Sequence, residues 1–357
     1  MPVFIQSAEA ISPQDTFQPA GPQAESPRAG NTPEIEFRPL PGEGYHNCIH
    51  PDYKQYINPT ALRRMSPLIR MGLAASKICV EKAGIEKPDA ILVGSGLGCV
   101  RDTVKFLNQL IENQETLLNP TAFIQSTHNT VSGQIALMLD CRAHNLTFSQ
   151  ESISFETALL EGMLLLNEDK ATNILLGGID EVVEESFQLM ERNACVNGPM
   201  GEGSNFFVVS SERSAKSMAR MDGLKILNHC KPGDISRHTG DFLASRGLAF
   251  DDIDLLVSGR NGDGNSGEIY APVEQLFHPS KLAEYKHLVG EYNTASAFAM
   301  WLAAGIIRDQ HIPDAILSGR SGNKEDAPRS GPIRRVLLFN QNKARDFSWI
   351  LLSHPGS

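Results

Sequence analysis

Short apolar segments alternate with amphipathic segments along most of the chain. The segments at 89–98, 173–181 and 205–211 are rich in Ile, Leu, Val and Phe and end in small or polar residues. Between them, apolar residues recur at i, i+3 and i+4, as in residues 155–166, which is the period of a helix. Strands that are apolar on both faces belong to sheets covered by helices on both sides. The pattern therefore predicts an α/β fold with buried sheets.

The second half of the chain repeats this alternation. Its predicted strands and helices lie at 223–230, 233–248, 252–264, 269–277, 294–310, 334–341 and 347–354. Two similar halves indicate an internal duplication with a seam near residues 212–222, so we expect two parts, residues 1–215 and 216–357. Residues 12–44 are rich in Pro, Gln, Glu and Gly and predict a long loop.

The composition argues against several classes of protein. A net charge of −10 and a pI near 5.5 argue against binding to nucleic acid or to an anionic membrane surface. The amino terminus lacks the features of a signal peptide, and no apolar run approaches the roughly 20 residues that span a bilayer. The six cysteines form no CxxC pair, so we expect reduced thiols in a cytoplasmic protein without a metal site or cofactor.

Two loops invite a chemical interpretation. The sequence GSGLGC at 94–99 follows a strand, but its GxGxG spacing and the lack of a following acidic partner favour a simple turn over a dinucleotide site. Residues 144–166 predict a strand, a polar turn and an amphipathic helix, a layout that can present a nucleophile. That turn holds Glu151 and Ser152 and no cysteine. Ser152 could be a nucleophile, but the favoured interpretation is that Ser152 or Ser154 caps the helix.

An ordered series of segments extends over nearly the whole chain. They are ISPQDTF, RRMSPLIRMGLAAS, VGSGLG, NPTAFIQSTHNTVSGQIAL, LLGGIDE, GEGSNFFVVSSERSA and KHLVGEYNTASAF. In this order they resemble the β-ketoacyl synthase (condensing enzyme) family of the thiolase fold. The resemblance implies a thiolase-like α/β fold with two pseudo-repeated βαβαβαββ halves in five layers (αβαβα), and it implies a dimer.

The same resemblance implies a thiolate at a helix N-terminus, two histidines that stabilise an enolate, and a supporting lysine. The nucleophile position falls on Ser152, which follows Glu151. The first histidine loop reads GRNGDG here, so Arg260 or Asn261 stands at that position. The second histidine position holds Glu291, while the preceding Lys286 and Gly290 are kept. The glycine-rich loop near the C-terminus is replaced by FNQNKARDFS.

Several further residues are candidates by resemblance. An ion pair between Glu291 and either Arg260 or Lys286 would fill the former catalytic cavity. His128 and Asn129 lie in a segment that is near the dimer interface in the family, and His128 could reach a partner's acyl tunnel. Phe155 is a candidate for the tunnel or interface. Asp180 and Glu181 match a motif that is structural in the family.

These replacements predict a chain-length-factor-like subunit that does not catalyse condensation. Such a subunit pairs with an active ketosynthase partner as a heterodimer and serves a pathway that uses an acyl carrier protein, such as polyketide, aryl-polyene or fatty-acid biosynthesis. The acidic charge predicts that the carrier docks mainly on the partner. The alternatives are an active synthase, acyltransferase or hydrolase that uses Ser152, a malonyl-carrier decarboxylase that uses Glu151 or Ser152, and a homodimer that binds acyl chains without turnover.

Overall fold

The computed structural model describes residues 2–18, 35–116, 118–193, 198–261, 264–317 and 331–357. Part of the loop predicted at 12–44 and part of the GRNGDG loop therefore lie outside the described residues. Within the described part, no helix is long and apolar enough to cross a membrane.

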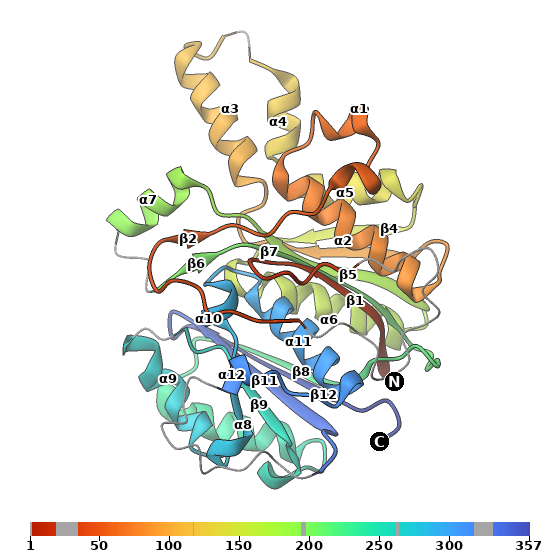
Figure 1. The fold of residues 1–357 in the computed structure, drawn as a ribbon, viewed down its shortest axis with the longest axis vertical. Coiled ribbons are helices and arrows are strands. Elements are labelled where there is room, and N and C mark those ends of the chain that lie inside the picture. The colour runs from red at the N-terminus through yellow and green to blue at the C-terminus, as the bar shows by residue number, and fades with distance from the viewer. Residues whose placement is uncertain (1, 19–34, 117, 194–197, 262–263, 318–330) are drawn as a thin grey trace.

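The N-terminal half contributes five strands to the central sheet. In spatial order they are β1 (Val3–Ile11), β7 (Gly203–Ser210), β5 (Asn173–Asp180), β3 (Ala90–Gly94) and β4 (His144–Phe148). β7 runs antiparallel to both β1 and β5, whereas β5, β3 and β4 are parallel to one another. β4 lies at the edge of the sheet (Figure 1).

The C-terminal half uses the same arrangement. Its strands, in the equivalent order, are β8 (Ala219–Asn228), β12 (Asp346–Ser353), β11 (Arg335–Asn342), β9 (Leu255–Ser258) and β10 (Leu282–Glu284). β12 is antiparallel to β8 and β11, and β11, β9 and β10 are parallel. Strand order and direction therefore repeat between the halves, as an internal duplication predicts.

One strand pair joins the two halves. β1 and β8 are antiparallel neighbours, so hydrogen bonds connect all ten of these strands into one sheet. The five strands of each half form one of the two sheet layers described below. β7 ends and β8 begins on either side of residue 215, where the sequence predicts a boundary between 1–215 and 216–357. We keep that boundary as a proposal. A small separate sheet pairs β2 (Tyr45–His46) with β6 (Met200–Gly201).

Helices cover the sheet in three layers (Figure 1). From the N-terminal side these layers are formed by α2 (Pro67–Ala83) and α5 (Thr130–Met138), then α6 (Ser154–Asn167) and α11 (Ala295–Asp309), then α8 (Ile235–Ala244) and α9 (Gly264–Glu274). α6 and α11 both pack against strands of both halves. The resulting order is helix, sheet, helix, sheet, helix, which is the five-layer arrangement that the resemblance implies.

The alternation of side chains along β5 explains why the sheets are buried on both faces. Ile174 and Leu176 belong to the core that contains the central helices, whereas Leu175 and Ile179 belong to the core beneath α2 and α5. All four side chains are fully buried. Each contributes roughly 1.5–3 kcal/mol by leaving water. A strand of this kind cannot be placed at the surface without losing one of the two cores.

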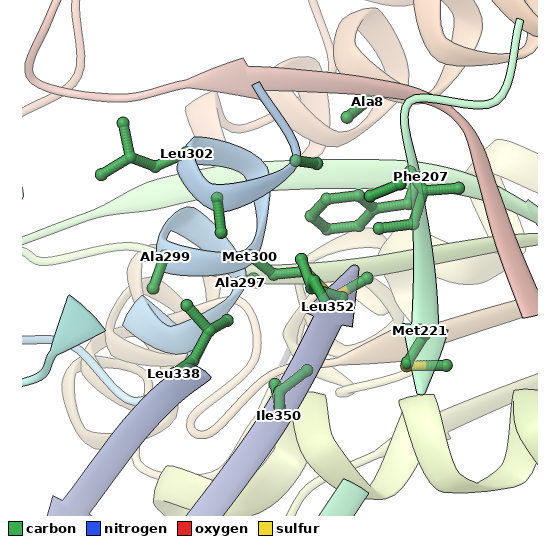
Figure 2. Packing of buried hydrophobic residues seen from close by; sticks show 14 of the residues in the cluster. Ala8, Phe207, Met221, Ala297, Ala299, Met300, Leu302, Leu338, Ile350 and Leu352 are labelled. Atoms are coloured by element: carbon green, nitrogen blue, oxygen red, sulfur yellow. The ribbon is translucent and has the colours of Figure 1, made fainter. Parts of the chain in front are cut away.

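The central core draws residues from both halves (Figure 2). Phe207 of β7 and Ile350 and Leu352 of β12 approach Ala297 and Met300 of α11 in this layer. Because this core contains both central helices, their N-terminal ends are fixed relative to both sheets. These ends carry the positions that the sequence marks as candidates for chemistry.

The remaining helices lie mostly outside this stack. They are α1 (Pro59–Leu62), α3 (Val100–Glu112), α4 (Pro120–Ser126), α7 (Glu184–Arg192), α10 (Lys286–Val289) and α12 (Asp314–Leu317). α3 and α4 form a helical hairpin that projects from the body (Figure 1). α4 was not predicted from the sequence, although Asn119 accepts a hydrogen bond from Thr121 N and Pro120 occupies the first helical position, which is a recognisable helix start.

Candidate functional site

The turn between β4 and α6 contains Ser152, which the resemblance matches to the nucleophile of the family. Residues Glu151–Ile153 form a 3-10 turn, and Glu151 has a φ of 48°. This left-handed conformation costs a non-glycine residue roughly 1 kcal/mol. Ser154 holds the turn in place, because its hydroxyl accepts a hydrogen bond from Gln150 N (2.8 Å) and donates one to the carbonyl of Glu151 (2.6 Å).

The prediction that Ser152 or Ser154 caps α6 is wrong. The residue at the N-cap of α6 is Ile153, and no side chain caps this helix end. Ser154 is already inside the helix and bonds back to the turn. The buried Ser152 hydroxyl donates instead to Asp346 Oδ2, at 3.2 Å. The tertiary contact with β12 therefore replaces the local cap that the sequence favoured.

Asp346 belongs to the segment that replaces the family's glycine-rich loop. Arg345 places its Nη2 2.7 Å from Asp346 Oδ2 and 2.9 Å from Glu151 Oε2. Burial opposes ionisation of Asp346, but hydrogen bonds and charge from Arg345 hold the pKa of Asp346 below its ordinary value. A carboxylate with a lowered pKa is a weak base. Asp346 therefore orients the Ser152 hydroxyl without activating it as a nucleophile.

An open depression of about 750 Å³ lies in front of this turn. Its lining includes Glu151, Thr157, Asn228, Arg345 and Asp346. The charged residues in the lining are Glu151, Arg345 and Asp346, and Arg345 forms ion pairs with both carboxylates.

Two further positions, Asn261 and Glu291, which the resemblance matches to the family's histidines, meet at a second cluster. Lys286 Nζ lies 2.8 and 2.7 Å from the two carboxylate oxygens of Glu291, and Asn261 Nδ2 lies 3.2 Å from Oε2. The Lys286 side chain is only 1% exposed, and that of Glu291 is 33% exposed. Gly290 lies between them with a φ of 75°, which a glycine adopts without strain.

Arg260 lies in a different ion-pair network. Its Nη2 is 2.5 Å from Glu274 Oε2, and its Nε is 3.7 Å from Glu284 Oε1. The predicted alternative in which Arg260 pairs with Glu291 is therefore wrong, and Lys286 takes that role. Asn261, rather than Arg260, approaches Glu291 from the loop that carries the first histidine in the family.

This arrangement does not provide the electrostatics of an enolate site. Neither Ser152 nor Glu291 has a histidine among its hydrogen-bond partners in the described part of the chain. Glu291 forms an ion pair with Lys286, and a carboxylate at this position repels the negative charge that develops on an enolate. The amide of Asn261 is directed at that same carboxylate.

The remaining candidates are dispersed. Phe155 is fully buried and packs against Phe207 in the central core, so it does not line the open surface of this chain. His128 and Asn129 are exposed at the start of α5. The ring of His128 lies against Gly98, where an added Cβ would be 3.0 Å from its Cδ2. These two residues remain candidates for an interface.

The turn at 94–99 has a structural role, as predicted. Asp180 accepts hydrogen bonds from Gly96 N, Ser95 Oγ and both the backbone N–H and the hydroxyl of Thr294. Asp180 thereby fixes this turn to the start of α11. A Cβ on Gly96 would meet the side chain of Asn293 at 2.1 Å, so the small residue serves close packing.

The sequence analysis missed one buried carboxyl in the central layer. Glu156 of α6 is fully buried, and its Oε1 accepts a hydrogen bond from Ser348 of β12 at 2.8 Å. Burial raises its pKa, although the Ser348 and Ser296 hydroxyls and Lys286 act in the opposite direction. Arg345 and Asp346 were also missed, although the loss of the glycine-rich loop marked their segment.

Comparisons with known proteins agree with this fold. A family model described as "Beta-ketoacyl synthase, N-terminal domain" matches residues 47–217. Among solved structures, the ishigamide ketosynthase/chain length factor is similar, with a TM-score of 0.78 and 16% identity over 99% of this chain and 98% of that chain. A β-ketoacyl synthase from Burkholderia phymatum has a TM-score of 0.72 and 13% identity, with 99% of each chain covered.

A third similar structure is the AntDE:AntF complex, a type II polyketide synthase acyl-carrier protein with its ketosynthase bound to the hexaketide. Its TM-score is 0.73 and its identity 13%, with 99% of each chain covered. Comparison with curated protein sequences gives no significant match. Residues 47–217 thus match the N-terminal domain of the β-ketoacyl synthases, and the chain as a whole has the thiolase-like fold of the similar ketosynthase structures.

Proposed function

We propose that this protein is a non-condensing, chain-length-factor-like subunit that pairs with an active ketosynthase. The observation that carries the proposal is the state of the three catalytic positions. They hold Ser152, Asn261 and Glu291, and the two carboxylates at these sites, Asp346 and Glu291, are bound to Arg345 and Lys286. A site organised in this way links the turn before α6 to β12 and pairs the charges that precede α11, but these positions offer neither a thiolate nor an imidazole.

We expect the partner to bind around the edge strand β4. Within the described residues, β4 pairs with β3 alone, so its outer backbone groups are available to another chain. Large apolar side chains are exposed on β4 and on the flanking helices, namely Leu146, Leu137, Leu160 and Leu164. An unpaired edge with apolar flanks favours a protein partner.

The identities of two similar structures support this choice of partner. One is a ketosynthase/chain length factor, and the other is a ketosynthase complex with an acyl-carrier protein. We infer that an acyl carrier delivers chains to the active partner and that this subunit shapes the space for the growing chain. We place the protein in the cytoplasm as part of the proposal, since the described cysteines are free thiols.

Pairing is tested by co-expression with the cysteine-containing ketosynthase encoded nearest to this chain, followed by size-exclusion chromatography. We expect a heterodimer, and we expect Leu146→Asp on β4 to reduce its yield at least about tenfold, because a charge would be buried at the interface. Leu189→Asp is the matched control, since Leu189 is an exposed leucine on α7, away from β4 in Figure 1. Failure to form any heterodimer, or equal loss in both variants, would contradict the pairing.

Inactivity is tested on the isolated subunit with acyl- and malonyl-loaded carrier protein. We expect neither a covalent acyl adduct by mass spectrometry nor release of carbon dioxide. The hydrogen bond from Ser152 to Asp346 is the one observation that favours an active acyltransferase. An adduct that disappears in Ser152→Ala would establish that alternative and remove the proposal.

A further inference from the structure

Two buried carboxyl groups lie at the base of the α3–α4 hairpin. Glu181 follows β5, and its side chain is 1% exposed. Its Oε1 accepts a hydrogen bond from Arg101 N at 2.9 Å, in the first turn of α3. Its Oε2 has no hydrogen-bond partner among the described residues, and Arg101 Nε is 4.0 Å away. A buried carboxyl that lacks part of its hydrogen bonding is costly to ionise.

The second carboxyl, Asp102, lies on the hairpin itself. Asp102 is 6% exposed, and its Oδ2 also lacks a hydrogen-bond partner in the described chain. Glu202 adds a third negative group, whose two oxygens accept hydrogen bonds from Cys48 N and Val182 N. Three carboxyl groups therefore lie at the base of the hairpin, where Arg101 and Lys105 of α3 supply the positive charge.

The groups that face Glu181 come from three elements. Arg101 and Asp102 belong to α3, Glu202 lies between β6 and β7, and the buried Cys99 thiol precedes α3. Burial raises the pKa of the Cys99 thiol well above its ordinary value, so Cys99 stays neutral. Glu202 and Asp102 oppose ionisation of Glu181, and Arg101 favours it.

The hairpin is attached to the body largely through this base. α3 has α4 as its main packing partner, and the pair extends away from the stacked layers (Figure 1). The hairpin also exposes a set of large apolar side chains, namely Leu107, Ile111, Phe123 and Ile124. Opening at the base would hydrate the two unpartnered oxygens, Glu181 Oε2 and Asp102 Oδ2, at the cost of few other contacts. Segments with little buried contact open locally without global unfolding.

We propose that the protonation of Glu181 controls how firmly the α3–α4 hairpin is attached to the body, with the protonated form holding it closed and the ionised form favouring local opening. The device needs only this chain. Its bearing on a ketosynthase partner rests on the proposed function.

The direction follows from proton linkage. Burial, as the largest effect, raises the pKa of Glu181 from its ordinary value of 4.5 to about 7. A raised pKa means that the closed state binds the proton more tightly than the open, hydrated state, so closure weakens as pH rises. For one such group, the opening constant increases about tenfold between about pH 6 and about pH 8, and it changes little above that range.

Hydrogen exchange on the full-length protein tests the proposal. The rates of the α3 amides are measured in the wild type and in Glu181→Gln at about pH 6, 7 and 8, and the ratio of the two proteins at each pH removes the intrinsic pH dependence of exchange. We expect the ratio of wild-type to variant opening to increase about tenfold across this range. Glu156→Gln is the matched control, since Glu156 is a buried carboxyl with a raised pKa outside the hairpin, and it should leave the α3 amides unchanged.

A constant ratio across the pH range would overturn the proposal, as would an equal response of the β5 amides, which would indicate global rather than local opening. If Glu181→Gln does not fold, the wild type alone provides the test. After correction for intrinsic exchange, the opening constants of its α3 amides must increase more with rising pH than those of its β5 amides. These outcomes do not depend on whether the chain binds a ketosynthase, so failure here is distinguishable from failure of the proposed function.

Discussion

The pair formed by Lys286 and Glu291 allows a quantitative test of how the former catalytic centre is held together. Lys286 is almost fully buried, and its Nζ is 2.7 Å from Glu291 Oε2. At this distance and an effective dielectric constant of about 20, the Coulomb attraction is about 6 kcal/mol. Desolvation of the ammonium group offsets much of this, and breaking a buried pair typically costs ~3–5 kcal/mol. Because Glu291 is 33% exposed, we expect the lower end of that range.

The perturbation is a double-mutant cycle of Glu291→Gln and Lys286→Met. Glu291→Gln leaves a buried cation without its carboxylate and should lower the free energy of unfolding by about 3 kcal/mol. Lys286→Met leaves a carboxylate that water can reach, so about 1–2 kcal/mol is expected. The double variant removes both charges and should be no less stable than Glu291→Gln alone, which gives a coupling energy of about 1–2 kcal/mol.

Urea unfolding monitored by circular dichroism measures all four proteins. Costs that add to within about 0.5 kcal/mol would refute the reasoning, because they would mean that the two charges do not stabilise one another.

Three further outcomes follow from particular side chains. Phe155→Ala should cost about 3–5 kcal/mol in urea unfolding, because it leaves a cavity in the central core, and a cost below about 1 kcal/mol would contradict the burial. Glu151→Gly should be about 1 kcal/mol more stable than Glu151→Ala in the same assay, since both lose the ion pair with Arg345 and only glycine relieves the left-handed backbone; equal stabilities would show that the turn is unstrained. The Glu181 carboxyl should contribute a stability of about 3 kcal/mol that is fully present below pH 4.5 and is lost as pH rises through about 7, and Glu181→Gln should abolish this part of the pH dependence of thermal unfolding.

The pattern of apolar residues was sufficient for most of the fold. The run at 173–181 and the helical spacing at 155–166 predict β5 and α6, and both elements are found there. Burial on both faces of a strand is visible in the sequence because it removes the polar alternation of a half-exposed strand. α4 and α7 were missed, since their short apolar patterns are weaker than those of the core helices.

The residues of the candidate site could be identified from the sequence, but their contacts could not. Resemblance placed Ser152, Lys286 and Glu291, but the contact from Ser152 to Asp346 joins residues that are 194 positions apart. The predicted cap was wrong for the same reason, because a local rule favoured a bond within the turn while the packed β12 supplied a stronger acceptor. The sequence offered Arg260 several possible carboxylate partners. Arg260 pairs with Glu274 because α9 places that carboxylate beside it.

By itself, the amino-acid sequence determined the order of strands and helices along the chain and the duplication, because both depend on local periodicity. The resemblance, not the periodicity, matched Ser152, Asn261 and Glu291 to the positions of the family's thiolate and imidazoles. Only the tertiary structure determined which charged groups form ion pairs, including that of Lys286, rather than Arg260, with Glu291. It also placed two buried carboxyl groups, each with one oxygen that lacks a hydrogen-bond partner, at the base of the projecting hairpin. The physical reason is that ion pairing and desolvation depend on distances and burial between segments that are far apart in the chain, and these are fixed when the two sheets close around α6 and α11.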